Sequence, residues 1–146
     1  MNEQEQAQQA QEAMVELYKE LSQSMCIPFD DQRIFMEACD QTTVDYNERQ
    51  YKMYLDLIKE EYEELFVAYG IRDKVEQLDA LIDILVVTIG AIHSLGANAE
   101  GAWNEVMRTN FAKIDEETGK VRKRDDGKVL KPEGWEPPHL ANYVEK

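Results

Sequence analysis

Cysteine is scarce in this sequence, which has only Cys26 and Cys39 among its 146 residues. Neither belongs to a CxxC pair or lies near a histidine cluster, so a disulfide framework and a zinc site have almost no support. We expect two reduced thiols in a helical core.

Long apolar runs are also missing. No stretch approaches the roughly 18 consecutive apolar residues that a membrane-spanning helix needs. The Gln- and Glu-rich start of the chain lacks the basic and apolar regions of a signal peptide. We therefore expect a cytoplasmic protein without a membrane partner.

Positive charge is the third shortage, because 16 basic residues stand against 30 acidic ones and give a formal net charge of −14. Such a chain is repelled by nucleic acid and anionic membranes unless basic residues gather locally. Two kinds of protein are exceptions: a nucleic-acid mimic, and an enzyme that holds cations between its carboxylates and an anionic substrate. The sequence also lacks a P-loop, a Ser/His/Asp arrangement and a reactive-cysteine setting, which agrees with metal-assisted hydrolysis.

Helical periodicity is the main feature that the sequence does contain. Its length and its 43% hydrophobic content fit one domain, residues 1–146, with a modest core. Apolar spacing and capping residues predict an all-α fold, a helical bundle of four to five helices. Residues 1–12 are expected to be the frayed start of a helix. The expected helices are Met14–Met25, which Pro28 stops; Asp31–Cys39, with Ile34, Phe35 and Ala38 inward; Asn47–Tyr69, ended by Gly70; Asp73–Leu95, ended by Gly96; and Ala99–Ile114, capped by Asn98.

The pattern changes to alternation after residue 118. Asp126-Gly127 is a turn signal, so residues 120–124 and 128–131 are predicted to form a C-terminal β-hairpin, and residues 118–146 a hairpin with an irregular tail. The hairpin is basic, and its basic residues are Lys120, Arg122, Lys123, Arg124, Lys128 and Lys131. It could fold over bound phosphates or over a partner subunit, or simply be exposed.

An acidic run, Glu60-Glu61-Tyr62-Glu63-Glu64, lies in the helix that starts at Asn47. At about 100° per residue, Glu61 falls inside the apolar stripe and Glu64 on its margin. Glu60 lies just outside the stripe, and Glu63 points well away from it. The run therefore divides into a part turned toward the core edge and a solvated part. A wholly solvated helix face remains the alternative.

The next helix is apolar nearly all round between Leu78 and Ile92, and its only charged residues there are Asp79 and Asp83. They are four residues apart and share one face. Burying carboxylates costs several kcal/mol without a compensating charge, and no Lys or Arg occurs between Gln77 and Met107. A residue from elsewhere or a metal ion must compensate them, and Mg²⁺ takes such oxygen ligands. The short connection predicts that the two acidic helices are antiparallel neighbours. A capping role explains Glu76 instead.

These residues resemble the MazG-like, all-α nucleoside triphosphate pyrophosphohydrolases, which include phosphoribosyl-ATP pyrophosphohydrolase and the dimeric all-α dUTPases. Their EExxE motif is present as Glu60, Glu61 and Glu64. Their ExxD motif is altered: Asp83 matches its Asp, Ala80 replaces its Glu, and Asp79 stands one residue earlier. The resemblance implies Mg²⁺, or Mn²⁺ in its place, held by Glu61, Glu64, Asp79 and Asp83, with Glu60 and Glu61 as catalytic residues.

The resemblance covers about residues 50–140 and includes the segment VMRTNFAK, Val106–Lys113. It implies that Asn110 and Lys113, with Arg108 beside them, bind the substrate phosphates. Favourable placement of Arg108 and Lys113 near a helix C-terminus is the alternative.

The resulting hypothesis is Mg²⁺-dependent hydrolysis of a nucleoside or deoxynucleoside triphosphate to a monophosphate and pyrophosphate, in a house-cleaning role. We expect a homodimer or a dimer of dimers that binds no nucleic acid. The alternative is a non-enzymatic acidic helical interaction protein or nucleic-acid mimic.

Overall fold

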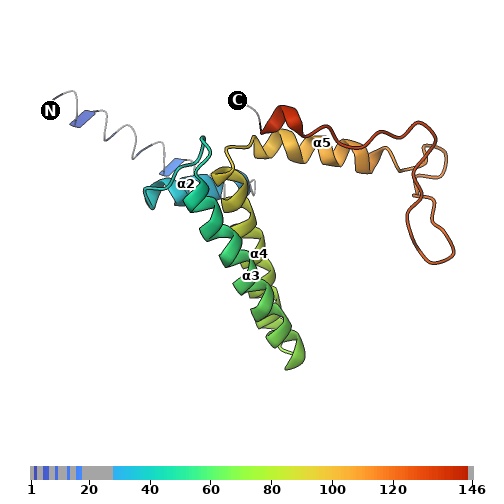
Figure 1. The fold of residues 1–146 in the computed structure, drawn as a ribbon, viewed down its shortest axis with the longest axis horizontal. Coiled ribbons are helices and arrows are strands. Elements are labelled where there is room, and N and C mark those ends of the chain that lie inside the picture. The colour runs from blue at the N-terminus through green and yellow to red at the C-terminus, as the bar shows by residue number, and fades with distance from the viewer. Residues whose placement is uncertain are drawn as a thin grey trace.

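Helices build the described part of the chain in this computed structural model (Figure 1). The structure describes residues 28–144 and, before them, Asn2, Glu5, Gln6, Gln9, Ala13, Glu16 and Leu17. The predictions of a frayed start and of a helix over Met14–Met25 therefore lie largely outside the described residues. The elements in chain order are α2 (Pro28–Ala38), α3 (Glu48–Gly70), α4 (Lys74–Ser94), α5 (Ala99–Phe111) and the 3₁₀ turn η1 (Ala141–Tyr143).

Side-chain caps begin the three longer helices as the sequence predicts. The side chains of Asn47, Asp73 and Asn98 accept hydrogen bonds from backbone N–H groups two or three residues later. These bonds satisfy donors that an α-helix leaves free in its first turn. The short link between α3 and α4 then returns the chain, and the two helices run antiparallel along each other (Figure 1).

Several predicted helix ends are wrong. Helix α2 begins at Pro28, three residues before the predicted start at Asp31, and the fixed φ and missing N–H of proline suit that position. Gly70 is the last helical residue of α3, and Arg72 takes the left-handed conformation instead, with φ of 59°. The last helix ends at Phe111, three residues early, where the Trp135 indole donates to a carbonyl of its last turn.

The core lies where α2 crosses the α3–α4 pair. Met36, Tyr54 and Ala91 form its buried centre, one residue from each helix. The helices α3 and α4 approach closely here, because a Cβ on Gly90 would stand 2.2 Å from the Tyr54 ring. The predicted inner face of α2 is wrong, since Met36 and Gln32 are buried while Phe35 is 62% exposed. Cys39 is also exposed rather than buried, and Cys26 lies outside the described residues.

The predicted burial of α4 on most sides is not met within one chain. Its apolar side chains Leu78, Leu81, Ile82 and Leu85 are about half exposed or more. Asp79 is exposed and Asp83 is half-buried. The α3–α4 pair is thus closed at the α2 end and has open apolar faces elsewhere, so one chain does not form a closed bundle.

The all-α prediction is confirmed, but the predicted C-terminal β-hairpin is wrong. The chain does reverse at Gly127, which has φ of 85°. Only two isolated bridges, Ile114 with Val121 and Lys123 with Val129, form in this region, and no strand occurs in residues 28–144. Basic side chains dominate the alternating segment, so it has no apolar face that packing could hold flat.

The helix α5 leaves the α3–α4 pair, with an angle of 113° between α4 and α5, and the C-terminal tail returns along it (Figure 1). No single helix in the described residues has the length and apolar character to cross a membrane. The bent pair α4 and α5 meets that test only when both helices are taken together.

Candidate functional site

Glu61 is the most unusual acidic residue of the α3–α4 pair. Its side chain is half-buried, and its Oε2 atom is buried without a hydrogen-bond partner among the described residues. The apolar spacing of α3 places this carboxylate toward α4, as predicted. A carboxylate oxygen buried without a donor costs free energy, so this position calls for a proton or a cation.

Four further carboxylates surround Glu61. Burial is the largest cause that raises the pKa of Glu61, and repulsion from Glu64, Asp83, Glu60 and Asp79 raises it further, in that order. Of the five carboxylates, Glu61 included, three come from α3 and two from α4. The antiparallel pairing therefore brings together the five acidic residues that the sequence singles out.

No basic side chain in residues 28–144 forms an ion pair with any of these five carboxylates. Lys59 reaches Glu63 instead, at 3.9 Å from Nζ to Oε1, and both side chains are exposed. Glu63 therefore belongs to the solvated face, as predicted. A cation bound at this cluster would therefore not compete with an existing ion pair in this part of the chain.

The cluster fits a divalent cation by its chemistry and its charge. Carboxylate oxygens are the ligands that Mg²⁺ prefers, and the unpartnered Glu61 oxygen offers one of them. In the described part of the chain, no three His, Cys, Asp or Glu side chains stand close enough to hold an ion as they are placed. Glu60, Glu64 and Asp79 are exposed, so their side chains can rotate toward Glu61 without breaking core packing.

Two of the predicted phosphate-binding residues, Arg108 and Asn110, lie on α5, and Lys113 follows its end; α5 leads away from this cluster (Figure 1). Arg108 forms a two-pronged ion pair with Glu105, at 2.7 and 2.9 Å, which lowers the pKa of Glu105 to about 2. Glu105 also accepts a hydrogen bond from the backbone N–H of His139, so Arg108 helps to hold the tail on α5. Lys113 donates to the Asn110 side chain at 3.1 Å. One chain thus does not bring these residues to its own carboxylates.

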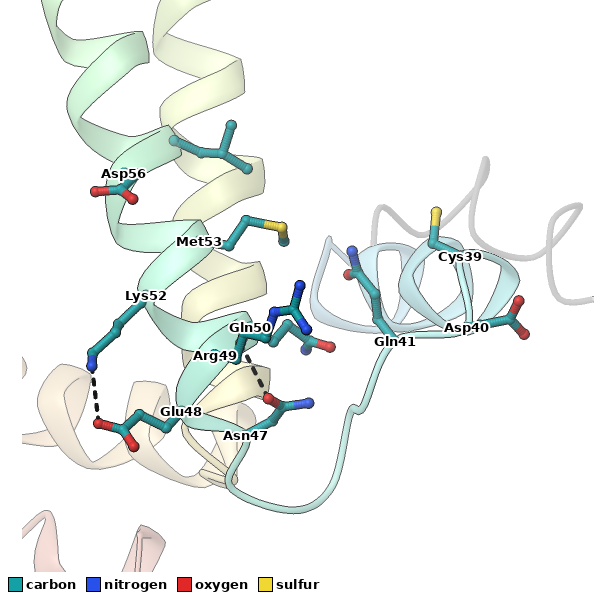
Figure 2. A pocket seen from close by; sticks show the side chains of 11 residues that line it. Cys39, Asp40, Gln41, Asn47, Glu48, Arg49, Gln50, Lys52, Met53 and Asp56 are labelled. Carbon is teal, nitrogen blue, oxygen red and sulfur yellow. Dashed lines mark hydrogen bonds and ion pairs between the residues drawn. The ribbon is translucent and has the colours of Figure 1, made fainter.

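A pocket of about 1100 Å³ opens between the end of α2 and the first turns of α3 (Figure 2). We call it the polar pocket because most of the residues that line it are polar or charged. In Figure 2 the side chain of Gln41 projects from the end of α2 toward α3, which contributes Arg49 and Met53. The pocket extends along α3 to Asp56 and Leu57, and the next turn of the helix carries Glu60 and Glu61. It therefore adjoins the acidic cluster.

Hydrogen bonds fix the wall of this pocket. Gln50 accepts from the backbone N–H of Thr42 and donates to the Thr42 carbonyl and to Ser94 Oγ, at 2.9, 2.7 and 2.7 Å. The Tyr54 hydroxyl donates to Gln41 Oε1. Sequence reasoning missed the pocket because residues 40–46 read only as a connection. Gln50 was interpreted only as part of the N-cap at Asn47, and its bonds to Thr42 and Ser94 join segments that no local pattern connects.

Comparison with known proteins agrees with the acidic motifs. A model of the phosphoribosyl-ATP pyrophosphohydrolase family matches residues 30–110, which is more than half of the chain. The match includes the polar pocket and all five clustered carboxylates, and it ends before Lys113 and the C-terminal tail. A search of curated proteins found no match.

Proposed function

The chain belongs to the phosphoribosyl-ATP pyrophosphohydrolase family, within the MazG-like all-α superfamily, and we propose that it is a Mg²⁺-dependent hydrolase of nucleoside or deoxynucleoside triphosphates. The family is one of nucleotide pyrophosphohydrolases. The products would be a nucleoside monophosphate and pyrophosphate. The corresponding role is the removal of surplus or non-standard nucleotides in the cytoplasm.

The observation that carries this proposal is the buried, unpartnered oxygen of Glu61 among four carboxylates without a basic partner. A nucleic-acid mimic would instead spread its acidic groups over an exposed surface. We assign the cation to Glu61, Glu64, Asp79 and Asp83. When bound, Mg²⁺ would offset the negative charge of the triphosphate and of the carboxylates.

Glu60 is the carboxylate of the EExxE motif that this assignment leaves free. It would orient a water molecule and accept its proton as the water oxygen bonds to the α-phosphorus. The bond between the α-phosphorus and the bridging oxygen to the β-phosphorus breaks, and pyrophosphate leaves with that oxygen. The cluster thereby separates the water-activating carboxylate from those that hold the cation.

We propose that the polar pocket is the binding site of the nucleoside. It is large enough for a base and sugar, and it leads along α3 directly to the turn that carries Glu60 and Glu61. A nucleoside there would point its phosphates at the acidic cluster. The amide side chains of the wall are chemically suited to base edges, since an amide both donates and accepts hydrogen bonds.

A second copy of the chain would complete this arrangement. Apolar side chains of α3 and α4 are left exposed by one chain, among them Phe66, Val67, Leu78 and Ile82. Because α5 points away from its own carboxylates, Asn110 and Lys113 would act on the substrate of the partner. We therefore propose a homodimer, or a dimer of such dimers, as the active form.

The test is hydrolysis of a panel of NTPs and dNTPs with and without Mg²⁺. We expect monophosphate and pyrophosphate as products, with no turnover in EDTA. Asp83→Asn should abolish turnover and leave the helical circular-dichroism signal unchanged. Glu63→Gln is the matched control, because this exposed neighbour pairs with Lys59, and it should retain activity. Release of orthophosphate, or equal activity of both variants, would refute the proposal.

A further inference from the structure

A second, smaller pocket lies at the other end of the molecule. It has a volume of about 270 Å³ and lies between the end of α5 and the C-terminal tail. Three basic side chains from separate segments line it: Lys113, Arg122 and Lys131. All three follow residue 110 and so lie outside the family match. Two acidic residues, Asp115 and Glu133, line it as well, so this cavity carries a small excess of positive charge in a chain with a net charge of −14.

Trp135 fixes two of these cations. Its indole Nε1 donates to the Thr109 carbonyl at 2.8 Å, which holds the ring against the end of α5. The ammonium groups of Lys113 and Lys131 lie 5.1 and 4.5 Å from the centre of this ring. Two cations beside one indole repel each other, and neither forms an ion pair in the described part of the chain. The two lysines therefore present positive charge at this pocket that a bound anion would compensate.

One of the two acidic residues that line this pocket is already compensated. Asp115 accepts hydrogen bonds from the backbone N–H groups of Glu117 and Thr118 and from the guanidinium of Arg122. These bonds lower the pKa of Asp115, with the Thr118 N–H as the largest cause. The last carbonyls of α5 are bonded by backbone N–H groups and by the Trp135 indole. Glu133 also lines the pocket, but it is exposed, so water solvates its charge.

We propose that this pocket is a binding site for a phosphate-class oxyanion, with Lys113, Arg122 and Lys131 as its ligands. Tetrahedral phosphate oxygens match ammonium and guanidinium donors in charge and geometry. The anion could be free pyrophosphate or the phosphate chain of a nucleotide held by a second copy. The site does not depend on the carboxylates of its own chain, so it can be tested without turnover.

The experiment uses the full chain in EDTA with inorganic pyrophosphate as the probe. Trp103→Phe leaves Trp135 as the only indole, and its fluorescence then reports binding beside the two lysines. We expect saturable binding of pyrophosphate that chloride at equal ionic strength does not reproduce. Lys131→Gln in this background should weaken binding by about tenfold, as the loss of one charge-assisted contact implies.

Lys123→Gln is the matched control, because it removes the same charge from the same exposed segment without lining the pocket. It should bind pyrophosphate like the parent, and Arg122→Gln should bind more weakly. Equal affinities of the Lys131 and Lys123 variants, or no saturable binding, would overturn the proposal. Once turnover is measured, a raised KM of Lys131→Gln assigns the site to the nucleotide phosphates, and an unchanged KM with weaker pyrophosphate binding assigns it to free pyrophosphate. If the chain proves inactive, the binding experiment in EDTA still decides the proposal.

Discussion

The α3–α4 pair and the α5–tail region handle charge in opposite ways. The pair gathers five carboxylates around a buried oxygen of Glu61 and provides no cation for them. The α5–tail region gathers three cations around a pocket and compensates its own carboxylates, Asp115 and Glu105, with hydrogen bonds and ion pairs. The carboxylates of the pair lack what a metal would supply. In the described part of the chain, Lys113 and Lys131 of the tail form no ion pair, whereas Arg122 is paired with Asp115. The proposed substrate, a nucleotide with Mg²⁺, would supply both a cation for the carboxylates and an anion for the lysines.

The largest effect on this comparison is expected from removal of the negative charge of Glu61. Glu61→Gln should lower kcat by at least about a hundredfold, because it removes a proposed ligand and the carboxylate nearest the other four. The same change should raise the Tm of the metal-free chain, since it relieves repulsion and leaves an amide that can donate. Steady-state kinetics and thermal unfolding in EDTA measure both effects.

Addition of Mg²⁺ should reverse the difference in Tm between wild type and Glu61→Gln. The wild-type chain should gain Tm on addition of Mg²⁺, and Glu61→Gln should gain little, because only binding to the folded state raises the free energy of unfolding. A Gln variant that is less stable than wild type in EDTA would show that Glu61 has a favourable partner in the apo protein.

A second substitution tests how tightly α3 and α4 pack against each other at Gly90. Gly90→Ala should destabilise the fold by about 2 kcal/mol, because its Cβ would stand 2.2 Å from the Tyr54 ring. Gly70→Ala is the control, since no atom lies within 4 Å of its Cβ, and it should stabilise α3 by up to about 1 kcal/mol. Urea unfolding compares the two. Equal effects would mean that the packing at Gly90 relaxes freely.

Short-range rules predicted much of this molecule. Asn47, Asp73 and Asn98 cap their helices because capping needs only three or four neighbouring residues. The position of Glu61 on the apolar stripe followed from helical spacing alone. The inner face of α2 was predicted wrongly, because it depends on how α4 crosses that helix, and periodicity carries no such information.

Other features depended on contacts that no local pattern encodes. The polar pocket exists because Gln50 ties the segment after α2 to Ser94 of α4, across 44 residues of sequence. Leu78 and Ile82 were predicted to be buried but are exposed, because an apolar pattern does not tell whether the same chain or a second copy, as we propose, covers it. The turn at Gly127 was found, but strands need an apolar face and neighbours as well as a turn.

A smaller effect is expected from loosening the tail. Trp135→Phe keeps a ring near the two lysines but removes the donor to the Thr109 carbonyl, a bond worth about 1 kcal/mol. Backbone amides of the tail should then exchange hydrogen faster, while those of α3 and α4 stay unchanged. Trp103→Phe is the control, since Trp103 is 56% exposed and contacts Phe29 rather than the tail. Uniform protection in both variants would show that other contacts hold the tail.

The smallest effect is a pH dependence that belongs to the acidic cluster alone. Burial and repulsion raise the pKa of Glu61 above its ordinary value of 4.5, so the folded chain keeps this proton to a higher pH than the unfolded chain does. Between 4.5 and the raised pKa the folded state binds more protons, and the free energy of unfolding contributed by Glu61 falls as the pH rises. In EDTA, the Tm advantage of Glu61→Gln over wild type should therefore grow from pH 4.5 upward and level off above the raised pKa.

Other groups, His93 and Glu105 among them, act in the opposite direction on the wild-type curve. Burial lowers the pKa of His93, and the Arg108 ion pair lowers that of Glu105, so both favour the folded state as the pH rises through their windows. Both are present in wild type and in Glu61→Gln, and their contributions cancel in the difference between the two proteins. A difference in Tm that does not change with pH would mean that the Glu61 carboxylate titrates as if exposed. The claim that the α3–α4 pair holds uncompensated negative charge would then lose its physical basis. The proposal of an anion site between α5 and the tail would not be affected.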